Sequence, residues 1–123
     1  MAKAKKMEFG PYIRQLRTDK GITLRTFAKM LHVSPTYVSQ IEMGNFSPPA
    51  EERVVRMAQI LGEDPDELLA LAGRVADDLP EIIKEHPREM ASFLRSVQGF
   101  TAEEIPRLLK QAEKMKQQRK PQS

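Results

Sequence analysis

The chain has 123 residues, 40% of them hydrophobic and 30% charged, with a net charge of +3, which suits one small domain with an appendage. It contains no cysteine, which excludes a disulfide framework and a thiolate metal site. No apolar stretch is long enough for the hydrophobic part of a signal peptide or for a membrane span, so we expect a cytoplasmic protein without membrane contact.

The first predicted element is a helix over about residues 8–19. Its apolar residues Phe9, Ile13 and Leu16 recur with helical spacing and define one face. The preceding residues, 1–7, contain three lysines and predict a basic, flexible arm. Such an arm could reach DNA phosphates or simply be disordered, and the sequence leaves both open.

Residues 23–44 predict two short helices joined by a tight turn, with the sequence TLRTFAKMLHVSPTYVSQIEMG. Thr23 caps the first helix, and Ser34 as N-cap with Pro35 at the first helical position begins the second. Gly44 ends the second helix. Apolar residues of the first helix recur at i, i+3, i+4 and i+7 and must be buried: Leu24, Phe27, Ala28 and Leu31.

The second of these helices is polar on one side. Only Val38 and Ile41 are clearly apolar and expected to face inward. A helix that merely filled a core would not need the donors and acceptors of its other side chains, so the pattern predicts a helix that reads the major groove of DNA. The alternative is an ordinary solvated helix. The polar side chains are those of Thr36, Tyr37, Ser39 and Gln40.

Two more helices complete an all-α, five-helix domain over residues 8–73. The fourth helix is predicted at about 50–61, after a pair of prolines. The fifth begins with a capping box, with Asp64 as N-cap, Pro65 at the first position and Glu67 at the third. The apolar residues expected to face inward are Val54, Met57, Ala58, Leu61, Leu68, Leu69, Leu71 and Ala72.

A small helical C-terminal unit follows over residues 74–116, and residues 117–123 are predicted to be a disordered tail. Thr101 and Glu104 form another capping box at the start of its last helix. A unit of this size cannot bury its apolar stripes alone. It must therefore pack on the domain before it, on itself or on another chain. The stripes comprise Leu79, Ile82, Ile83, Met90, Phe93, Leu94, Val97, Ile105, Leu108, Leu109, Ala112 and Met115.

Charge is distributed unevenly along the chain. Residues 1–60 contain ten Lys and Arg against five Asp and Glu, whereas residues 61–100 contain four against nine. A basic domain joined to an acidic segment is typical of a DNA-binding protein that has a separate surface for another partner. Acidic helices are as often only solvated, so the role of the acidic segment stays open.

The predicted helices over about residues 9–71 resemble the lambda-repressor-like (Cro-type, XRE) helix-turn-helix family of bacterial and phage transcription regulators. Ala28 stands where that family needs a small residue for a close helix crossing. Val38 and Ile41 match buried positions of its recognition helix. The exit over residues 44–49 follows the family's Gly-Asn-x-x-x-Pro pattern.

The resemblance has one departure and one further implication. His32 stands in the turn where the family usually has glycine with a positive φ, so we expect a positive φ with some strain there. Arg17 and Glu42 match positions at which many members hold a partly buried ion pair between the first and third helices. Their role would be structural.

Carried over by position, the resemblance assigns the contacts with DNA. Gln40 would read a base directly, since its amide can pair with adenine N6 and N7, and Thr36 would pack its methyl group against thymine. The implied base-reading residues are Pro35, Thr36 and Gln40, flanked by Tyr37 and Ser39. The implied phosphate contacts are the backbone N–H groups near Leu24, the side chain of Arg25, and Asn45.

The sequence therefore predicts a sequence-specific transcription regulator that binds double-stranded DNA. We expect a dimeric repressor that reads a pseudo-palindromic operator through the helix at 35–43 and pairs through its C-terminal helices. The alternative is an antitoxin-like or protease-responsive regulator whose C-terminal helices bind a toxin or a protease. No acid, base and nucleophile are grouped as in an enzyme, and no cofactor or metal site is expected, since His32 and His86 are isolated.

Overall fold

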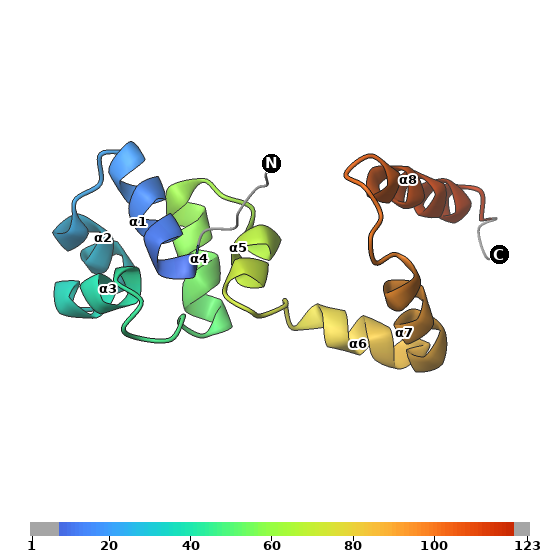
Figure 1. The fold of residues 1–123 in the computed structure, drawn as a ribbon, viewed down its shortest axis with the longest axis horizontal. Helices are drawn as coiled ribbons and strands as arrows, with labels where there is room; N and C mark the ends of the chain where they lie inside the picture. Colours follow the sequence, from blue (N-terminus) through green and yellow to red (C-terminus); the bar gives the residue numbers. More distant parts are fainter. Residues whose placement is uncertain (1–7, 120–123) are drawn as a thin grey trace. The chain divides into compact units, whose positions relative to one another are not determined.

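The computed structural model describes residues 8–119, which form eight helices and no strand (Figure 1). The predicted basic arm at residues 1–7 and the last four residues of the predicted tail lie outside the described residues. The chain divides into two compact units, an N-terminal unit that ends at Leu79 and a C-terminal unit that begins at Pro80. The expected all-α fold class is confirmed.

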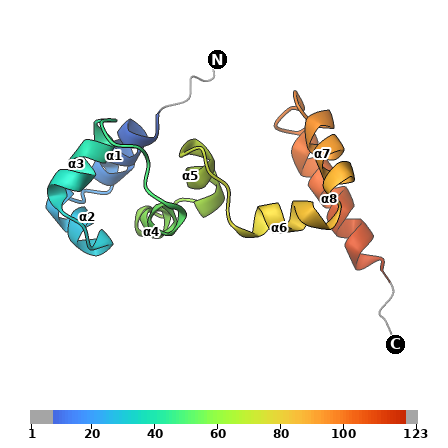
Figure 2. The same ribbon diagram turned by 90° about the horizontal axis from the view of Figure 1, so that it is seen from below.

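Five helices build the N-terminal unit. Helix α2 packs on α3 and on α4, α1 packs on α3, and α4 packs on α5 (Figures 1 and 2). Each predicted helix is present within one or two residues of its expected bounds. The bounds are α1 (Phe9–Asp19), α2 (Leu24–Leu31), α3 (Pro35–Glu42), α4 (Glu51–Leu61) and α5 (Pro65–Leu71).

Three of these helices begin at the predicted N-cap side chains. The side-chain oxygens of Thr23, Ser34 and Asp64 each accept a hydrogen bond from the backbone N–H three residues later, at 3.1, 3.0 and 3.0 Å. Each bond satisfies one of the N–H groups that a helix start leaves without an intrahelical acceptor. The start points of α2, α3 and α5 are therefore determined locally.

The turn between α2 and α3 passes through His32. This residue has φ 61° and ψ 42°, in the left-handed region, as expected from its position in the turn. The turn is closed by the N–H of Val33, which donates to the carbonyl oxygen of Ala28 at 3.0 Å. A side chain at a positive φ costs conformational energy that glycine avoids.

The core lies between α1, α2, α3, α4 and α5. Most residues of the predicted apolar faces are buried there, whereas Leu16, Leu24, Leu71 and Ala72 are only half-buried. Ala28 is 1% exposed, as expected for a small residue where two helices meet. The buried hydrophobic residues are Phe9, Ile13, Phe27, Ala28, Leu31, Val38, Ile41, Val54, Met57, Ala58, Leu61, Leu68 and Leu69.

Gly10 brings α1 against the end of α3. A Cβ atom at this position would fall against the backbone carbonyl oxygens of Ile41 and Glu42, 2.8 Å from that of Glu42. Only a residue without a side chain allows this approach. Nothing local in the sequence signals this contact, because its partners are about thirty residues away along the chain.

Residues after α5 still belong to the N-terminal unit. The Arg74 guanidinium donates from Nε to the carbonyl oxygen of Pro49 at 2.8 Å and from Nη2 to that of Pro48 at 3.0 Å. The backbone N–H of Asp77 donates to the Glu51 carboxylate at 3.3 Å. These contacts extend the compact unit beyond Gly73, to Leu79.

Three helices follow: α6 (Asp78–Glu85), α7 (Pro87–Ser96) and α8 (Glu104–Gln117). Both bonds of the predicted capping box are present, from Thr101 N–H to Glu104 Oε1 at 2.9 Å and from Glu104 N–H to Thr101 Oγ1 at 3.1 Å. None of the three helices contains a buried residue. No helix within residues 8–119 combines the length and the apolar character needed to cross a membrane.

Candidate nucleic-acid interface

Helix α3 presents an uncovered polar arc. At about 100° per residue, Pro35, Ser39, Thr36 and Gln40 span about 140° of the helix surface in that order. Pro35 and Thr36 are exposed, and Ser39 and Gln40 are half-buried. The opposite side of the helix is buried through Val38 and Ile41. The arc therefore offers donors and acceptors on a helix whose other side is anchored in the core.

Tyr37 lies at the edge of that arc and contacts two other elements. Its ring lies 5.9 Å from the ring of Phe46, centroid to centroid, and the planes are tilted by 46°. The guanidinium carbon of Arg53 lies 5.5 Å from the centre of the Tyr37 ring, a cation–π distance. Sequence reasoning placed Tyr37 correctly on α3 but did not single out Arg53, since the contact joins two helices.

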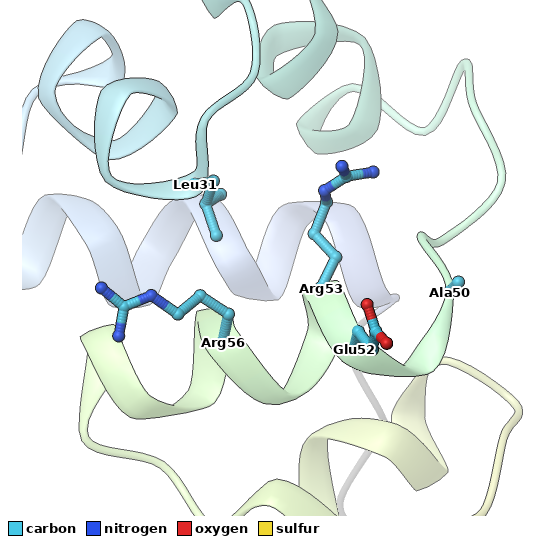
Figure 3. A pocket seen from close by; sticks show the side chains of 5 residues that line it. All are labelled: Leu31, Ala50, Glu52, Arg53 and Arg56. Carbon is cyan, nitrogen blue, oxygen red and sulfur yellow. The ribbon is translucent and has the colours of Figure 1, made fainter.

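Arg53 also lines an open groove of about 330 Å³ between α2 and α4. Figure 3 shows Arg53 and Arg56 extending from the same side of α4, on either side of Leu31. Glu52 supplies one carboxylate to the same groove. The Arg53 guanidinium, over the ring of Tyr37, adds positive charge near the polar arc.

The start of α2 holds two of the predicted phosphate contacts. Leu24 and Arg25 are its first two residues, and their N–H groups have no acceptor within the helix, since intrahelical bonding begins four residues in. The Arg25 side chain is exposed. Such a helix start attracts anions through its N–H groups and its dipole.

Asn45, the third predicted phosphate contact, is placed differently. Its Nδ2 donates to the Oε1 of Gln40 at 2.8 Å. Its backbone N–H donates to the carbonyl oxygen of Gln40 at 2.9 Å. Gly44, with φ 81°, turns the chain so that Asn45 returns to the helix end. The structure thus brings a residue of the exit loop together with the predicted base-reading residue.

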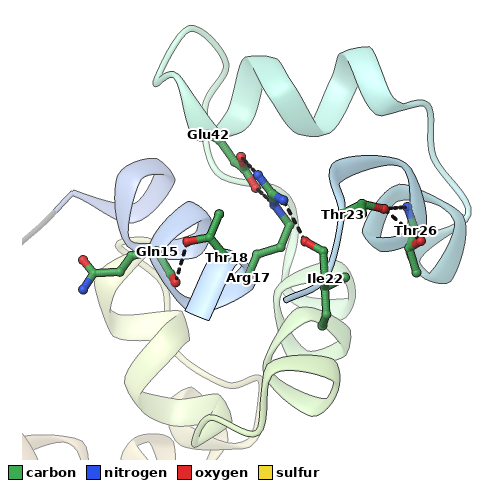
Figure 4. Close-up of polar contacts among 7 residues, drawn as sticks. All are labelled: Gln15, Arg17, Thr18, Ile22, Thr23, Thr26 and Glu42. Atoms are coloured by element: carbon green, nitrogen blue, oxygen red, sulfur yellow. Dashed lines mark hydrogen bonds and ion pairs between the residues drawn. The ribbon is translucent and has the colours of Figure 1, made fainter. Parts of the chain in front are cut away.

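Arg17 and Glu42, predicted as a pair, lie together in a buried bidentate ion pair (Figure 4). Arg17 Nε lies 2.7 Å from Glu42 Oε2, and Arg17 Nη2 lies 2.9 Å from Glu42 Oε1. A third donor, Nη1, bonds the carbonyl oxygen of Ile22 at 2.8 Å, which the sequence did not reveal. Hydrogen bonding to Glu42 raises the pKa of Arg17, against the opposing effect of burial. The pair fixes α3 relative to α1.

The described residues contain no cluster of three or more His, Asp or Glu side chains arranged to hold a metal ion. An exposed polar helix face, a free helix start and nearby guanidinium groups together form a surface that suits a negatively charged double helix.

Comparison with known proteins shows which family this part of the chain matches. Residues 13–68 match the helix-turn-helix family. The transcriptional regulator RamB of Mycobacterium tuberculosis is 28% identical over 99 residues, which cover 74% of this chain and 21% of RamB. This chain thus spans about a fifth of the length of the curated relative that it matches.

Two solved structures are also similar to part of the chain. The clp gene regulator ClgR from C. glutamicum is 34% identical, covering 53% of this chain and 83% of that one, with a TM-score of 0.45. The P22 c2 repressor, solved in complex with a synthetic operator, is 28% identical, covering 51% and 94%, with a TM-score of 0.47. Through residues 13–68, the chain belongs to the helix-turn-helix family of lambda-repressor-like proteins.

Proposed function

We propose that this chain is a cytoplasmic DNA-binding transcription regulator that reads a specific sequence through α3. The observation that carries the proposal is the polar arc of Pro35, Thr36, Ser39 and Gln40, left uncovered on a helix whose other side is buried. A major groove admits one α-helix, and short polar side chains near its N-terminal end reach base edges there. Membership of the helix-turn-helix family supports the same function.

The residues of the surface divide into two roles. Gln40 and Thr36 contact bases, with Pro35, Tyr37 and Ser39 around them. The N–H groups at the start of α2 and the Arg25 side chain bind phosphate, which positions the protein without reading sequence. Arg53, held over the Tyr37 ring, adds a second cationic contact on the α4 side.

We further propose that the protein is a dimeric repressor. The observation behind this proposal is the set of exposed apolar side chains on α6, α7 and α8. A two-fold dimer would place two α3 helices in successive major grooves about 34 Å apart and would read a pseudo-palindrome. The exposed set includes Leu79, Ile82, Phe93, Leu94, Ile105, Leu109 and Met115.

The same exposed residues support a second candidate function, in which these helices bind a different protein such as a toxin or a protease. The helices α6 and α7 also lie in the acidic segment, which suits a basic partner. A neighbouring toxin or peptidase gene would favour this candidate. A gene that stands alone would favour the repressor.

Selection of bound sequences from a random DNA pool tests the main proposal, because it reports the site, its symmetry and its half-site spacing together. The selected site is then used with two variants. Gln40→Ala should lose about 1–3 kcal/mol and relax preference at one position per half-site. Arg25→Ala should weaken binding to all sequences alike and reduce the salt dependence of log K by about one. Failure to enrich any sequence would refute the proposal.

A further inference from the structure

An exposed aromatic side chain lies beside the polar arc of α3. Gly44, with φ 81°, turns the chain back after the helix, and the backbone N–H of Phe46 donates to the carbonyl oxygen of Gln40 at 3.3 Å. The Phe46 ring packs on Tyr37, one turn nearer the start of α3, with 5.9 Å between the two ring centroids. Phe46 is therefore held both at its backbone and at its ring.

The Phe46 ring borders the arc at the end occupied by Gln40. Residues three apart on a helix are neighbours on its surface, so Tyr37 lies about 60° beyond Gln40. Phe46 is 48% exposed, and this apolar surface stays open although the ring contacts Tyr37. Apolar surface that is already held in place loses little freedom when a ligand covers it, which favours binding.

The surroundings of the ring indicate which part of DNA it would meet. Gln40, to which the Phe46 backbone is bonded, is the predicted base-reading residue. The Tyr37 ring that Phe46 contacts also lies 5.5 Å from the guanidinium carbon of Arg53, a charge that attracts phosphate. Phe46 is therefore close both to a side chain that would contact a base and to one that would contact phosphate.

We infer that Phe46 is a specificity-determining residue whose ring packs on the C5 methyl group of a thymine next to the base that Gln40 contacts. The inference rests on the proposed function and deepens it. Among the base edges in the major groove, thymine alone carries a methyl group, and the other bases present only donors and acceptors. The methyl group lies on the side of the base edge nearest its own backbone, within reach of a ring so placed. Covering it removes apolar surface from water, which favours thymine over the other bases.

Deoxyuridine tests this contact, because it lacks only the C5 methyl group of thymine and keeps its hydrogen-bonding groups. In the selected site, each thymine on either strand that neighbours the position where Gln40→Ala relaxes preference is replaced in turn. For the wild type, one of these replacements should weaken binding by about 4-fold per half-site, the value of one buried methyl group. Phe46→Ala, and Phe46→Gln as a larger polar replacement, should bind the thymine and deoxyuridine versions alike.

Thr36→Ser is the matched control, since Thr36 is also proposed to contact bases and serine lacks only its methyl group. Thr36 lies about 40° from Gln40, on the side of the arc away from Tyr37. Thr36→Ser should therefore keep the loss of about 4-fold at the thymine assigned to Phe46. If Thr36→Ser removes that loss and Phe46→Ala does not, the methyl contact belongs to Thr36 and the inference is wrong.

The inference is also overturned if the selected site has no thymine next to that position, or if the wild type binds every deoxyuridine version as tightly as the thymine version. A Phe46→Ala variant that binds both versions more weakly but keeps the wild-type ratio overturns it too, as a sugar or phosphate contact would give that result. Each of these results leaves sequence-specific binding by the wild type intact. A wild type that selects no sequence removes the proposed function and this inference together. Thermal melting checks that each variant is folded, and Phe46→Gln alone decides the ratio if Phe46→Ala is not.

Discussion

The side chain of Arg17 connects three parts of the N-terminal unit. From α1 it reaches the end of α3 through Glu42 and the loop before α2 through Ile22. Its side chain is 9% exposed and that of Glu42 is 4% exposed, so both charges are removed from water. Burying a charge is costly unless hydrogen bonds replace its hydration, and here the three guanidinium donors do so.

Removal of one partner of the Arg17–Glu42 pair should therefore strongly destabilise the N-terminal unit. Arg17→Met leaves the Glu42 carboxylate buried without its partner and should lower the free energy of unfolding by about 3–5 kcal/mol. Urea titration followed by tyrosine fluorescence measures this, because both tyrosines, Tyr12 and Tyr37, lie in the N-terminal unit. A double variant, Arg17→Met with Glu42→Leu, should recover part of the loss.

The exposed pair of Lys84 and Glu81 provides the comparison, with side chains 72% and 70% exposed. Lys84→Met should leave the stability of the N-terminal unit unchanged, because Lys84 and Glu81 lie in the C-terminal unit and their pair is exposed. If Arg17→Met cost no more than Lys84→Met, the buried pair would not hold α1 to α3.

A substitution at His32 should raise the free energy of unfolding, whereas Arg17→Met should lower it. Its φ of 61° costs about 1–2 kcal/mol for a residue with a side chain, whereas glycine loses about 0.5–1 kcal/mol through its greater freedom when unfolded. His32→Gly should therefore raise the free energy of unfolding by up to about 1 kcal/mol, as measured in the same urea titration. His32→Val should lower it, because a β-branched residue tolerates this conformation poorly. A His32→Gly variant less stable than the wild type would show that the imidazole contributes more than its strain costs.

At the scale of helices, Gly10 determines how closely α1 approaches α3. Replacing a glycine within a helix by alanine usually raises the free energy of unfolding by about 1 kcal/mol. Here the added Cβ would press on the backbone of Ile41 and Glu42, which cannot move aside as a flexible side chain would. Gly10→Ala should instead lower the free energy of unfolding by about 1–3 kcal/mol.

Gln15→Ala is the matched control, since Gln15 is exposed on the same helix. The Gln15→Ala variant should be as stable as the wild type or more stable, because alanine has the higher helix propensity. Urea titration of the two variants compares alanine at a crowded and an open position of α1. Equal stabilities would mean that the α1–α3 approach is not tight in solution.

The sequence predicted those features of the helices that have local causes. The caps at Thr23, Ser34 and Asp64 depend on a bond three residues away, and the apolar stripes follow from helical period. Contacts between elements had no such local signal, and the Arg17–Glu42 pair was expected only from the family resemblance. Gly10 against α3, Arg53 over Tyr37 and Asn45 on Gln40 depend on how helices pack or how a loop returns, and no pattern within one helix specifies that.

At the scale of the whole chain, the two units differ in how far their apolar residues are buried. The N-terminal unit encloses a core, whereas α7 and α8 each carry an apolar stripe without any buried residue. Leu109 is 58% exposed and Met115 is 72% exposed, although both lie on an amphipathic helix. Apolar surface exposed to this extent is typical of an interface with another chain.

We predict that the full chain is a dimer at micromolar concentration and that a chain ending at Leu79 is a folded monomer. The truncation point follows the structure, because it keeps the bonds of Arg74 to Pro48 and Pro49 that a chain ending at Gly73 would lose. Sedimentation of both proteins measures the oligomeric state. Leu109→Glu in the full chain should also dissociate the dimer, and Gln111→Glu, which adds the same charge on nearly the opposite side of α8, should not.

DNA binding then connects the oligomeric state to function. The shortened chain should bind the selected site about 10² to 10⁴ times more weakly than the full chain, because linking two reading helices makes the second contact intramolecular. On a single half-site the two proteins should bind alike. If Leu109→Glu instead leaves a dimer but lowers the melting temperature of the N-terminal unit, the stripes cover the same chain. If the shortened chain still dimerises, the interface lies within residues 1–79 and the C-terminal helices are free to bind another protein.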